Sequence, residues 1–449
     1  MVAAGQSIPH TTNLTMIEAQ PIQPLLPISA LSRIAAAVLH VLKYGALTLL
    51  VVFPLAFGGD TVRLNPAQQA SLGNQYSLVG WEISNFFDKW AHRVSSAVPW
   101  NSVDRNAAAL DYFRLQQDIN GSIDERNRAV AVGDTDVASD LAINISSLTQ
   151  ERDGLRNDAE EAIEAAISAA FNETGLRGWF GFVFPPVDIR LTDTPHLLIT
   201  SPRAAIAREH EALLTSDIDL DDRIVMEDTL EASGDRSAIT LQIGGLAAYP
   251  APIIGSSLRG TLHTAAHEWV HHYMFFKPLG QAMFSSGEMV SLNETVADII
   301  GRELGDRAYE IITGEPIHPP QPQAASQPVD EDRQPSETFD FNVEMRETRL
   351  HVDELLAAGQ VEEAEAYMEQ RRLFFVDNGH YIRKLNQAYF AFNGTYAENP
   401  TSSSPIGGQL TQLREQSADL GVFISTAAGV SSYLEFLSLL EKQSGGAGG

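Results

Sequence analysis

Two histidines spaced four residues apart constrain this chain more than any other feature of its sequence. The segment 259–276, RGTLHTAAHEWVHHYMFF, has the pattern of a helix, and His267 and His271 would share one face of it. Both imidazoles can therefore reach a single metal ion. Glu268 follows His267 directly and lies beside that face, where it can approach a water molecule without binding the ion itself. The fold must leave this helix face open to further ligands.

A second helical pattern downstream offers the third ligand. The segment 286–304, SGEMVSLNETVADIIGREL, carries Glu294 and Asp298 four residues apart. Glu294 would complete a His₂Glu set that leaves one coordination position open, and Asp298 could accept the free ring N–H of a liganding histidine. Carboxylates at this spacing commonly form only a solvent-facing helix surface, but their place after HEWVH favours a metal site. The chain contains no cysteine, so histidines and carboxylates must supply every metal ligand.

The two motifs together, HEWVH followed by NETVAD, resemble the thermolysin-like gluzincin zinc metallopeptidases. The likeness covers about residues 245–304 and includes Ser286-Gly287 before the second helix and the run from Asp298 to Gly301 within it. It implies a zincin-like domain with one Zn²⁺ per chain, whose ligands are His267, His271 and Glu294, whose general base is Glu268 and whose supporting carboxylate is Asp298. The 22 residues between His271 and Glu294 exceed the spacing of the thermolysin and aminopeptidase branches by a few, so the branch stays open.

Peptide hydrolysis at such a site needs a base and an oxyanion donor. Glu268 would take a proton from water and deliver it to the leaving amine, and the oxyanion would need a donor besides the metal. By residue type and by position after the ligand helix, the candidates are Tyr381, His380 and Tyr389, each of which can equally be an ordinary packed or surface residue. An edge strand over 245–253, which carries two prolines, would bind an extended peptide by strand addition, as the resemblance also implies.

The most apolar stretch of the chain is residues 34–57, IAAAVLHVLKYGALTLLVVFPLAF. Its 24 residues are enough to span a bilayer as a helix, although His40 and Lys43 interrupt it. We predict an uncleaved transmembrane anchor over 34–58, with a signal segment and a buried core helix as the alternatives. The positive charges lie on its N-terminal side, which predicts that the chain after the anchor lies on the far side of the membrane.

The charge of the chain is strongly acidic and unevenly spread. Its 58 Asp and Glu residues against 30 Lys and Arg give a net charge of −28. Residues 1–58 carry +1, so −29 falls on the rest of the chain. A surface this acidic disfavours nucleic acid, and no basic stripe offsets it. We therefore predict no nucleic-acid partner.

The remaining patterns predict an α+β fold. Two helical segments separated by Gly133-Asp134 should form a hairpin with one apolar seam. Strands are expected at VDIRL, HLLIT and SAITLQI, with helices near 203–215 and 221–233. The expected organisation is an N-terminal tail (1–33), an anchor (34–58), a helical region with the hairpin (59–178), a zincin-like metal-binding domain (179–314), a Pro-rich flexible linker (315–340), a helical C-terminal lobe (341–443) and a disordered tail (444–449).

Two functional hypotheses from different classes follow. The first is a membrane-anchored zinc metallopeptidase that hydrolyses peptide bonds in a peptide or protein substrate outside the cytoplasm. The second is a non-catalytic scaffold or interaction protein on a degenerate peptidase fold. The motif residues favour the first hypothesis, because a competent side chain fills every role. Substrate, cleavage specificity and oligomeric state have no signature in the sequence.

Overall fold

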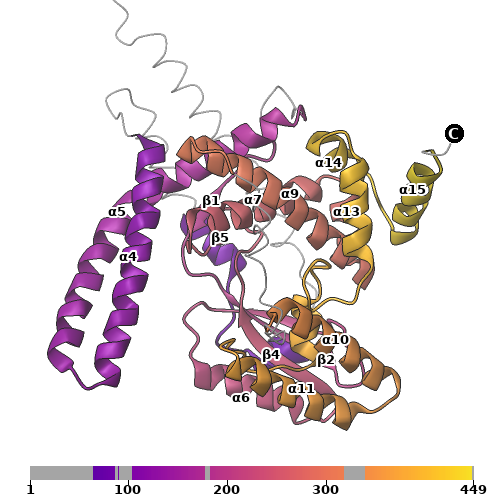
Figure 1. Ribbon diagram of the computed structural model, residues 1–449, viewed down its shortest axis with the longest axis horizontal. Helices are drawn as coiled ribbons and strands as arrows, with labels where there is room; N and C mark the ends of the chain where they lie inside the picture. Colours follow the sequence, from indigo (N-terminus) through magenta and orange to yellow (C-terminus); the bar gives the residue numbers. More distant parts are fainter. Residues whose placement is uncertain (1–63, 86–88, 90–103, 177–182, 318–338, 447–449) are drawn as a thin grey trace, which may run out of the picture.

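The computed structural model describes residues 64–85, 89, 104–176, 183–317 and 339–446, and it combines many helices with two small sheets. The α+β class predicted from the sequence is therefore confirmed. Figure 1 shows a mostly helical upper half and a lower half in which helices flank a sheet. The metal motif belongs to the upper half.

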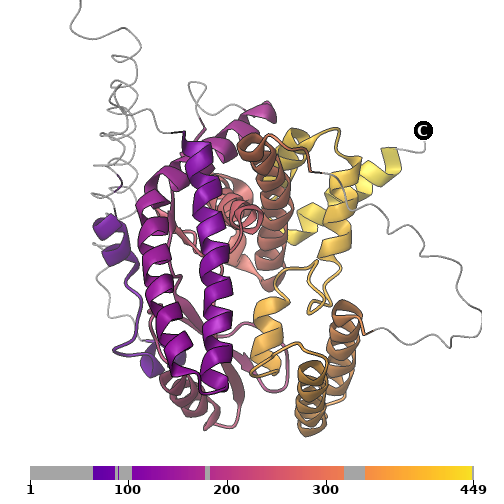
Figure 2. The same ribbon diagram turned by 60° about the vertical axis from the view of Figure 1, so that its left-hand side comes forward.

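The predicted helical hairpin is present and consists of two long helices. Helices α4 (Arg105–Ala131) and α5 (Thr135–Glu173) run side by side, which is clearest in Figure 2. Each helix begins at an aspartate whose side chain accepts a backbone N–H in the first turn. Gly133 joins them with a φ of 78°, a conformation that favours glycine. The C-terminal half of α5 is buried, because Ile163, Ile167 and Phe171 enter the main core.

The lower half is built on a three-stranded antiparallel sheet. Strand β2 (His196–Pro202) lies in the centre, between β3 (Glu211–Leu214) and β4 (Arg236–Gln242). Helix α6 (Leu220–Glu231) packs against β4, and α12 (Gln387–Asn393) packs against both β2 and β4. Helices α10 (Phe341–Ala357) and α11 (Val361–Asp377) pair with each other and enclose a separate apolar cluster around Met345, Met368 and Phe375.

The predicted helix near 203–215 is wrong, because this segment supplies strand β3. Its Ala- and Glu-rich composition favours a helix, but Leu213 pairs with Leu197 of the buried central strand. Alternate residues of β3 are buried, which is the period of a strand. Pairing with a buried strand has therefore overridden the local helix preference.

The upper half contains a two-stranded sheet next to the metal motif. Strand β1 (Ile189–Leu191) pairs in parallel with β5 (Ala251–Ile253). The expected strand over 245–253 forms only in its last three residues, because the chain before β5 folds back and Gly245 bridges Ile253. This turn carries Gly245 to the face of the helix that bears the histidines.

The core of the upper half is the crossing of α7 (Leu258–Phe275) with α9 (Gly287–Thr313). Both helices begin at a serine cap, Ser257 and Ser286 respectively. Where they cross, a Cβ at Gly301 would lie 2.9 Å from the backbone nitrogen of His267. Only glycine permits this approach. Leu262 of α7 and Val296 of α9 are fully buried in the same core, and each contributes about 1.5–3 kcal/mol by burial.

The remaining helices complete the two halves. Helices α13, α14 and α15 all pack against α9, whereas α10–α12 belong to the lower half, so the helices after residue 340 divide between the two. The bounds of the remaining elements are α2 (Pro66–Ala70), α8 (Pro278–Gln281), the 3₁₀ turn η2 (Met283–Ser285), α13 (Ile406–Gln416), α14 (Leu420–Ala428) and α15 (Tyr433–Gly446).

Several predicted segments lie outside the described residues. These are the tail 1–33, the anchor 34–58, most of the linker 315–340 and the last three residues of the tail 444–449. Helix α15 extends to Gly446, three residues into that tail. Within the part of the chain that the structure describes, no helix combines the length and the apolar character needed to cross a bilayer.

Candidate metal centre

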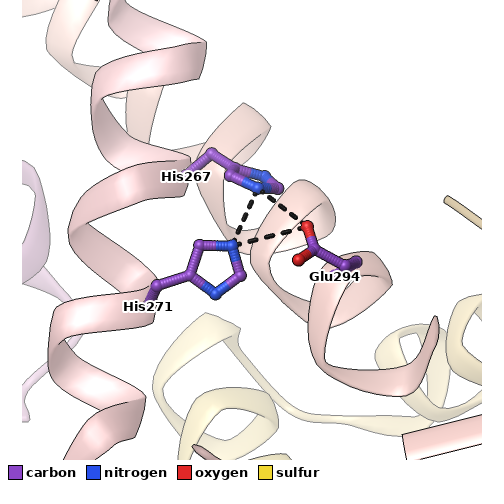
Figure 3. Close-up of side chains that lie close together, drawn as sticks. All are labelled: His267, His271 and Glu294. Atoms are coloured by element: carbon purple, nitrogen blue, oxygen red, sulfur yellow. Dashed lines mark hydrogen bonds and ion pairs between the residues drawn. The ribbon is translucent and has the colours of Figure 1, made fainter. Parts of the chain in front are cut away.

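Three side chains from two helices converge on one point. His267 and His271 project from the same face of α7, and Glu294 projects toward them from α9 (Figure 3). The two Nε2 atoms are 3.0 Å apart, and Oε2 of Glu294 lies 3.4 Å from Nε2 of His267 and 3.5 Å from Nε2 of His271. These are the three ligands predicted from the sequence, and together they form a group that could hold a metal ion.

The spacing of these atoms fits a small tetrahedral cation. A zinc ion bound at about 2.0–2.1 Å to each donor would hold them roughly 3.3 Å apart. The observed separations of 3.0, 3.4 and 3.5 Å lie close to that value. His₂Glu is also a donor set that leaves the fourth position open, as catalytic zinc sites do. The residues present therefore fit zinc in number, type and spacing.

A neighbouring amide fixes the orientation of one ligand. Nδ1 of His271 lies 2.9 Å from Oδ1 of Asn293, which can only accept a hydrogen bond. The ring therefore carries a proton on Nδ1, and Nε2, which faces His267 and Glu294, is the nitrogen that would bind a metal ion in place of a second proton. Asn293 itself is almost fully buried. The sequence offered this partner in the Asn-Glu pair, but the pairing with His271 becomes visible only once α7 and α9 are placed.

The electrostatics of the centre favour a positive charge. Burial alone would lower the pKa of His271, but Glu294, Glu268 and Asn293 together raise it to about 9. Burial likewise opposes ionisation of Glu294, yet the two histidines hold the pKa of its carboxyl far below the usual range. Both shifts mean that negative charge is held at the convergence point, where a cation is stabilised.

Glu268 lies beside the face of α7 that carries His267 and His271, in a position that is largely shielded from solvent. Its side chain is buried, and that burial raises the pKa of its carboxyl even though the histidines oppose the rise. A Cβ at Gly245 would lie 2.6 Å from Oε1 of Glu268, so the folded-back segment before β5 packs its backbone directly on the carboxylate. A raised pKa and an enforced position are the properties that a general base requires.

A tyrosine that the sequence did not single out lies at the same centre. The ring of Tyr396 is 6.0 Å from the ring of His267, centroid to centroid. Burial, followed by the charges of Glu294 and Glu268, raises the pKa of its hydroxyl well above the usual value, so this group remains an O–H donor. Its loop is fixed to α9 on both sides. Ser291 donates to the carbonyl of Thr395 at 2.8 Å, and Thr295 accepts from the N–H of Ala397 at 3.0 Å.

The three oxyanion donors predicted from the sequence lie elsewhere. Tyr381 is 84% exposed, and His380 stacks on Phe341 with ring centroids 4.6 Å apart. Tyr389 packs beside Phe390 and against the cluster on the lower sheet. None of the three is brought to the metal centre, because the segment 380–390 belongs to the lower half of the molecule. No pattern in the sequence singles out Tyr396, because its loop, NGTYAEN, consists of turn-forming residues and has no periodicity.

Asp298 does not accept from a histidine in this structure. Its Oδ2 pairs with Nη1 of Arg302, one turn along α9, at 3.2 Å. The role predicted for Asp298 at a ligand histidine is instead performed by Asn293 for His271. The arginine competes for the carboxylate because it presents a full charge at the favourable i, i+4 spacing.

Two further histidines of α7 have separate surroundings. His263 lies 2.5 Å from Asp306 through Nε2, and the same carboxylate is held by Arg259. This pairing keeps His263 away from the ligand group. His272 points toward Tyr249, with ring centroids 5.4 Å apart, and burial lowers its pKa to about 4.

The assembled centre therefore contains three converging metal donors, one enclosed carboxylate and one neutral hydroxyl. Such a set can bind a divalent cation, remove a proton from a bound nucleophile and donate a hydrogen bond to a developing negative charge. The chain was also compared with family models, with curated proteins and with solved structures, and none of the three comparisons found a match.

Proposed function

We propose that this protein is a zinc-dependent peptidase that hydrolyses peptide bonds in peptide or protein substrates. One observation carries the proposal: the donors of His267, His271 and Glu294 lie 3.0–3.5 Å apart, with the Glu268 carboxylate beside them. The resemblance of HEWVH and NETVAD to the gluzincin metallopeptidases supports the same reading. Tyr396 supports it as well, because its ring lies 6.0 Å from the ring of His267 and its hydroxyl stays protonated.

The chain's own residues can perform the required proton movements. A bound zinc ion would polarise the scissile carbonyl and lower the pKa of the attacking water. Glu268 accepts the proton of that water and delivers it to the leaving amine, and its raised pKa brings its basicity closer to neutral pH. Tyr396 donates its hydroxyl hydrogen to the oxyanion that forms as the carbonyl becomes tetrahedral. Asn293 holds the His271 ring throughout.

The proposal includes attachment to a membrane through residues 34–58. The apolar length of that segment, with Arg33 just before it and Lys43 in its N-terminal half, supports a single-pass anchor with the catalytic part on the far side of the membrane. The chain after residue 58 carries 28 Lys and Arg residues against 57 Asp and Glu, and a domain of this length is translocated largely regardless of its charge.

Metal analysis separates this proposal from a scaffold function. We expect one zinc per chain in purified wild-type protein and a loss of bound zinc in Glu294→Ala. We expect Glu268→Gln to keep the metal and to lose peptide hydrolysis, measured on a mixed peptide library. A wild-type protein that binds no zinc at micromolar free metal would refute the peptidase. Zinc binding without hydrolysis would favour the scaffold, and loss of metal in Glu268→Gln would show that Glu268 is itself a ligand.

A further inference from the structure

We propose that one end of the molecule, which we call the aromatic end, rests on a lipid bilayer. It is formed by residues 183–187, 269–287 and 420–434, which include the C-terminal part of α7, all of α8 and η2, and α14. In Figure 1, α14 lies in the upper part of the molecule, next to α13. This contact is distinct from the predicted anchor, which lies in another part of the chain.

The three segments are neighbours in space. The rings of Phe184 and Phe276 lie 5.1 Å apart, which joins the first segment to the end of α7. Helix α8 packs against α14, which joins the second segment to the third. A Cβ at Gly421 would lie only 2.2 Å from the carbonyl oxygen of Thr174, so α14 begins directly on the end of α5. The aromatic end is therefore one continuous region.

This region exposes large apolar side chains. Phe284 on η2 is 87% exposed and Phe275 at the end of α7 is 66% exposed. Phe184, Phe276 and Val422 are also exposed. These side chains stand at helix ends and turns, so they project from the molecule. Isolated exposed apolar residues are ordinary, but several aromatic ones gathered in one region mark a contact surface.

This region carries a weak positive charge, whereas the chain as a whole is strongly acidic. About one residue in eight of the whole sequence is Asp or Glu, yet these three segments contain neither, and their only charged residue is Lys277. Acidic residues adjoin the segments directly: Asp419 caps α14 by accepting from Val422 at 2.8 Å, Glu435 accepts from the N–H of Ser431 at 2.8 Å, and Glu288 is exposed in the first turn of α9. The three segments themselves offer a basic protein partner no complementary charge.

A bilayer is the partner that fits these properties. Aromatic side chains bordered by a lysine are typical of the membrane–water interface, and Lys277 lies over the Tyr273 ring at 5.0 Å with its amine free to reach headgroups. The chain as a whole is acidic and is repelled by anionic lipid, whereas the three segments of this end contain no carboxylate that would oppose contact. Burial of phenylalanine rings supplies the attraction, which should therefore be insensitive to salt.

The absence of native cysteine allows a clean test on the full chain. A fluorescent label would be attached to Phe284→Cys and, as a control, to Ile143→Cys, which is 68% exposed on α5. The control lies about 45 Å along the helix from the end of α5. In phosphatidylcholine vesicles, with and without 0.5 M salt, we expect lipid-borne nitroxide to quench the first label several-fold more strongly than the second. Water-soluble quencher should show the reverse order.

Equal quenching at the two positions would overturn the proposal, including the case in which the anchor alone holds the protein on the vesicle. Protection of the Phe284→Cys label before vesicles are added would also overturn it, because it would assign the surface to a second copy of the chain. As a second variant, Phe275→Ser in the labelled protein should reduce lipid quenching at least twofold while its circular dichroism stays unchanged. An undiminished signal would show that the aromatic end does not supply the contact.

Discussion

At the scale of single residues, the candidate metal centre combines side chains from two helices with groups that reach it from loops. The helical period alone places His267 beside His271, and the second helix supplies Glu294. By contrast, Tyr396 and Gly245 reach the centre from loops whose paths depend on long-range packing. Residue type and spacing hold no information about such paths. The three donors chosen by type, Tyr381, His380 and Tyr389, accordingly lie elsewhere.

The hydroxyl of Tyr396 should contribute to turnover and not to metal binding. We expect Tyr396→Phe to lower kcat by roughly 100-fold or more, because one oxyanion donor is typically worth that much, with KM little changed. Tyr381→Phe, on an exposed ring outside the centre, is the matched control and should behave as wild type. Steady-state kinetics with zinc content measured on the same samples tests this. Equal kcat values for the two variants would exclude Tyr396 from the reaction.

Gly245 should be required for the position of the base. A methyl group there would stand 2.6 Å from Oε1 of Glu268 and displace the carboxylate. We expect Gly245→Ala to lower kcat/KM at least about tenfold, because small misplacements of reacting groups are costly, while zinc content is unchanged. Gly244→Ala is the control, since its nearest atom would be Thr264 Cγ2 at 3.9 Å. A fully active Gly245→Ala would show that Glu268 tolerates movement.

His196 should make the protein less stable in mild acid. Burial, reinforced by Arg223, lowers the pKa of this ring below its usual value, so it is neutral in the folded protein. As the pH falls through about 6.5, the unfolded chain binds the proton first and stability is lost, at up to about 1.4 kcal/mol per pH unit. Urea unfolding at pH 7.5 and 5.5 should show a smaller pH-dependent loss for His196→Gln than for wild type. The same loss in both proteins would remove His196 as the cause.

At the scale of elements, a long segment with a clear apolar periodicity predicts its own secondary structure, whereas a short segment does not. The hairpin of α4 and α5 appears as its apolar seam predicts, because long helices average over many residues. Strand β3 was expected to be helical, since its four residues obtain their conformation from pairing with β2 and not from their own preference. Likewise, only three residues of the segment 245–253 become strand β5. What could not be predicted is the set of contacts between elements distant in the chain.

Two glycine-to-alanine changes in helices should have opposite effects on stability. At Gly301 the new methyl would lie 2.9 Å from the His267 backbone and force α7 and α9 apart, which should cost about 1–3 kcal/mol. At Gly154, in the middle of α5, nothing lies within 4 Å, so the better helix former should stabilise the protein by about 0.5–1 kcal/mol. Urea unfolding measures both values. Zinc affinity should fall only in Gly301→Ala, because α9 carries Glu294; a stabilised Gly301→Ala would contradict the tight crossing.

At the scale of the whole molecule, a series of contacts links the hairpin to the metal centre. Glu160 and Glu164 of α5 accept the N–H groups of Leu191 and Ile189, which fixes strand β1 on the hairpin. Strand β1 pairs with β5, whose Ile253 bridges Gly245, and Gly245 contacts Glu268. The hairpin looked purely structural in the sequence. In the fold it forms the support behind Glu268.

Lys89 is the charge on which that support depends. Its buried ammonium lies 2.5 Å from Glu164, 2.9 Å from Asp188 and 3.4 Å from Glu160, residues that are 71 to 99 positions away in the chain. Lys89→Met would leave buried carboxylates without the cation they share, and we expect it to cost about 3–5 kcal/mol of unfolding free energy. Adding Glu164→Gln should restore part of this loss, because the amide oxygen can still accept from Ile189 without a buried charge. Lys442→Met, at an exposed position of α15, should change stability by less than about 0.5 kcal/mol. If urea unfolding shows Lys89→Met to be as stable as Lys442→Met, the cluster does not hold the hairpin to the strand beside the metal centre.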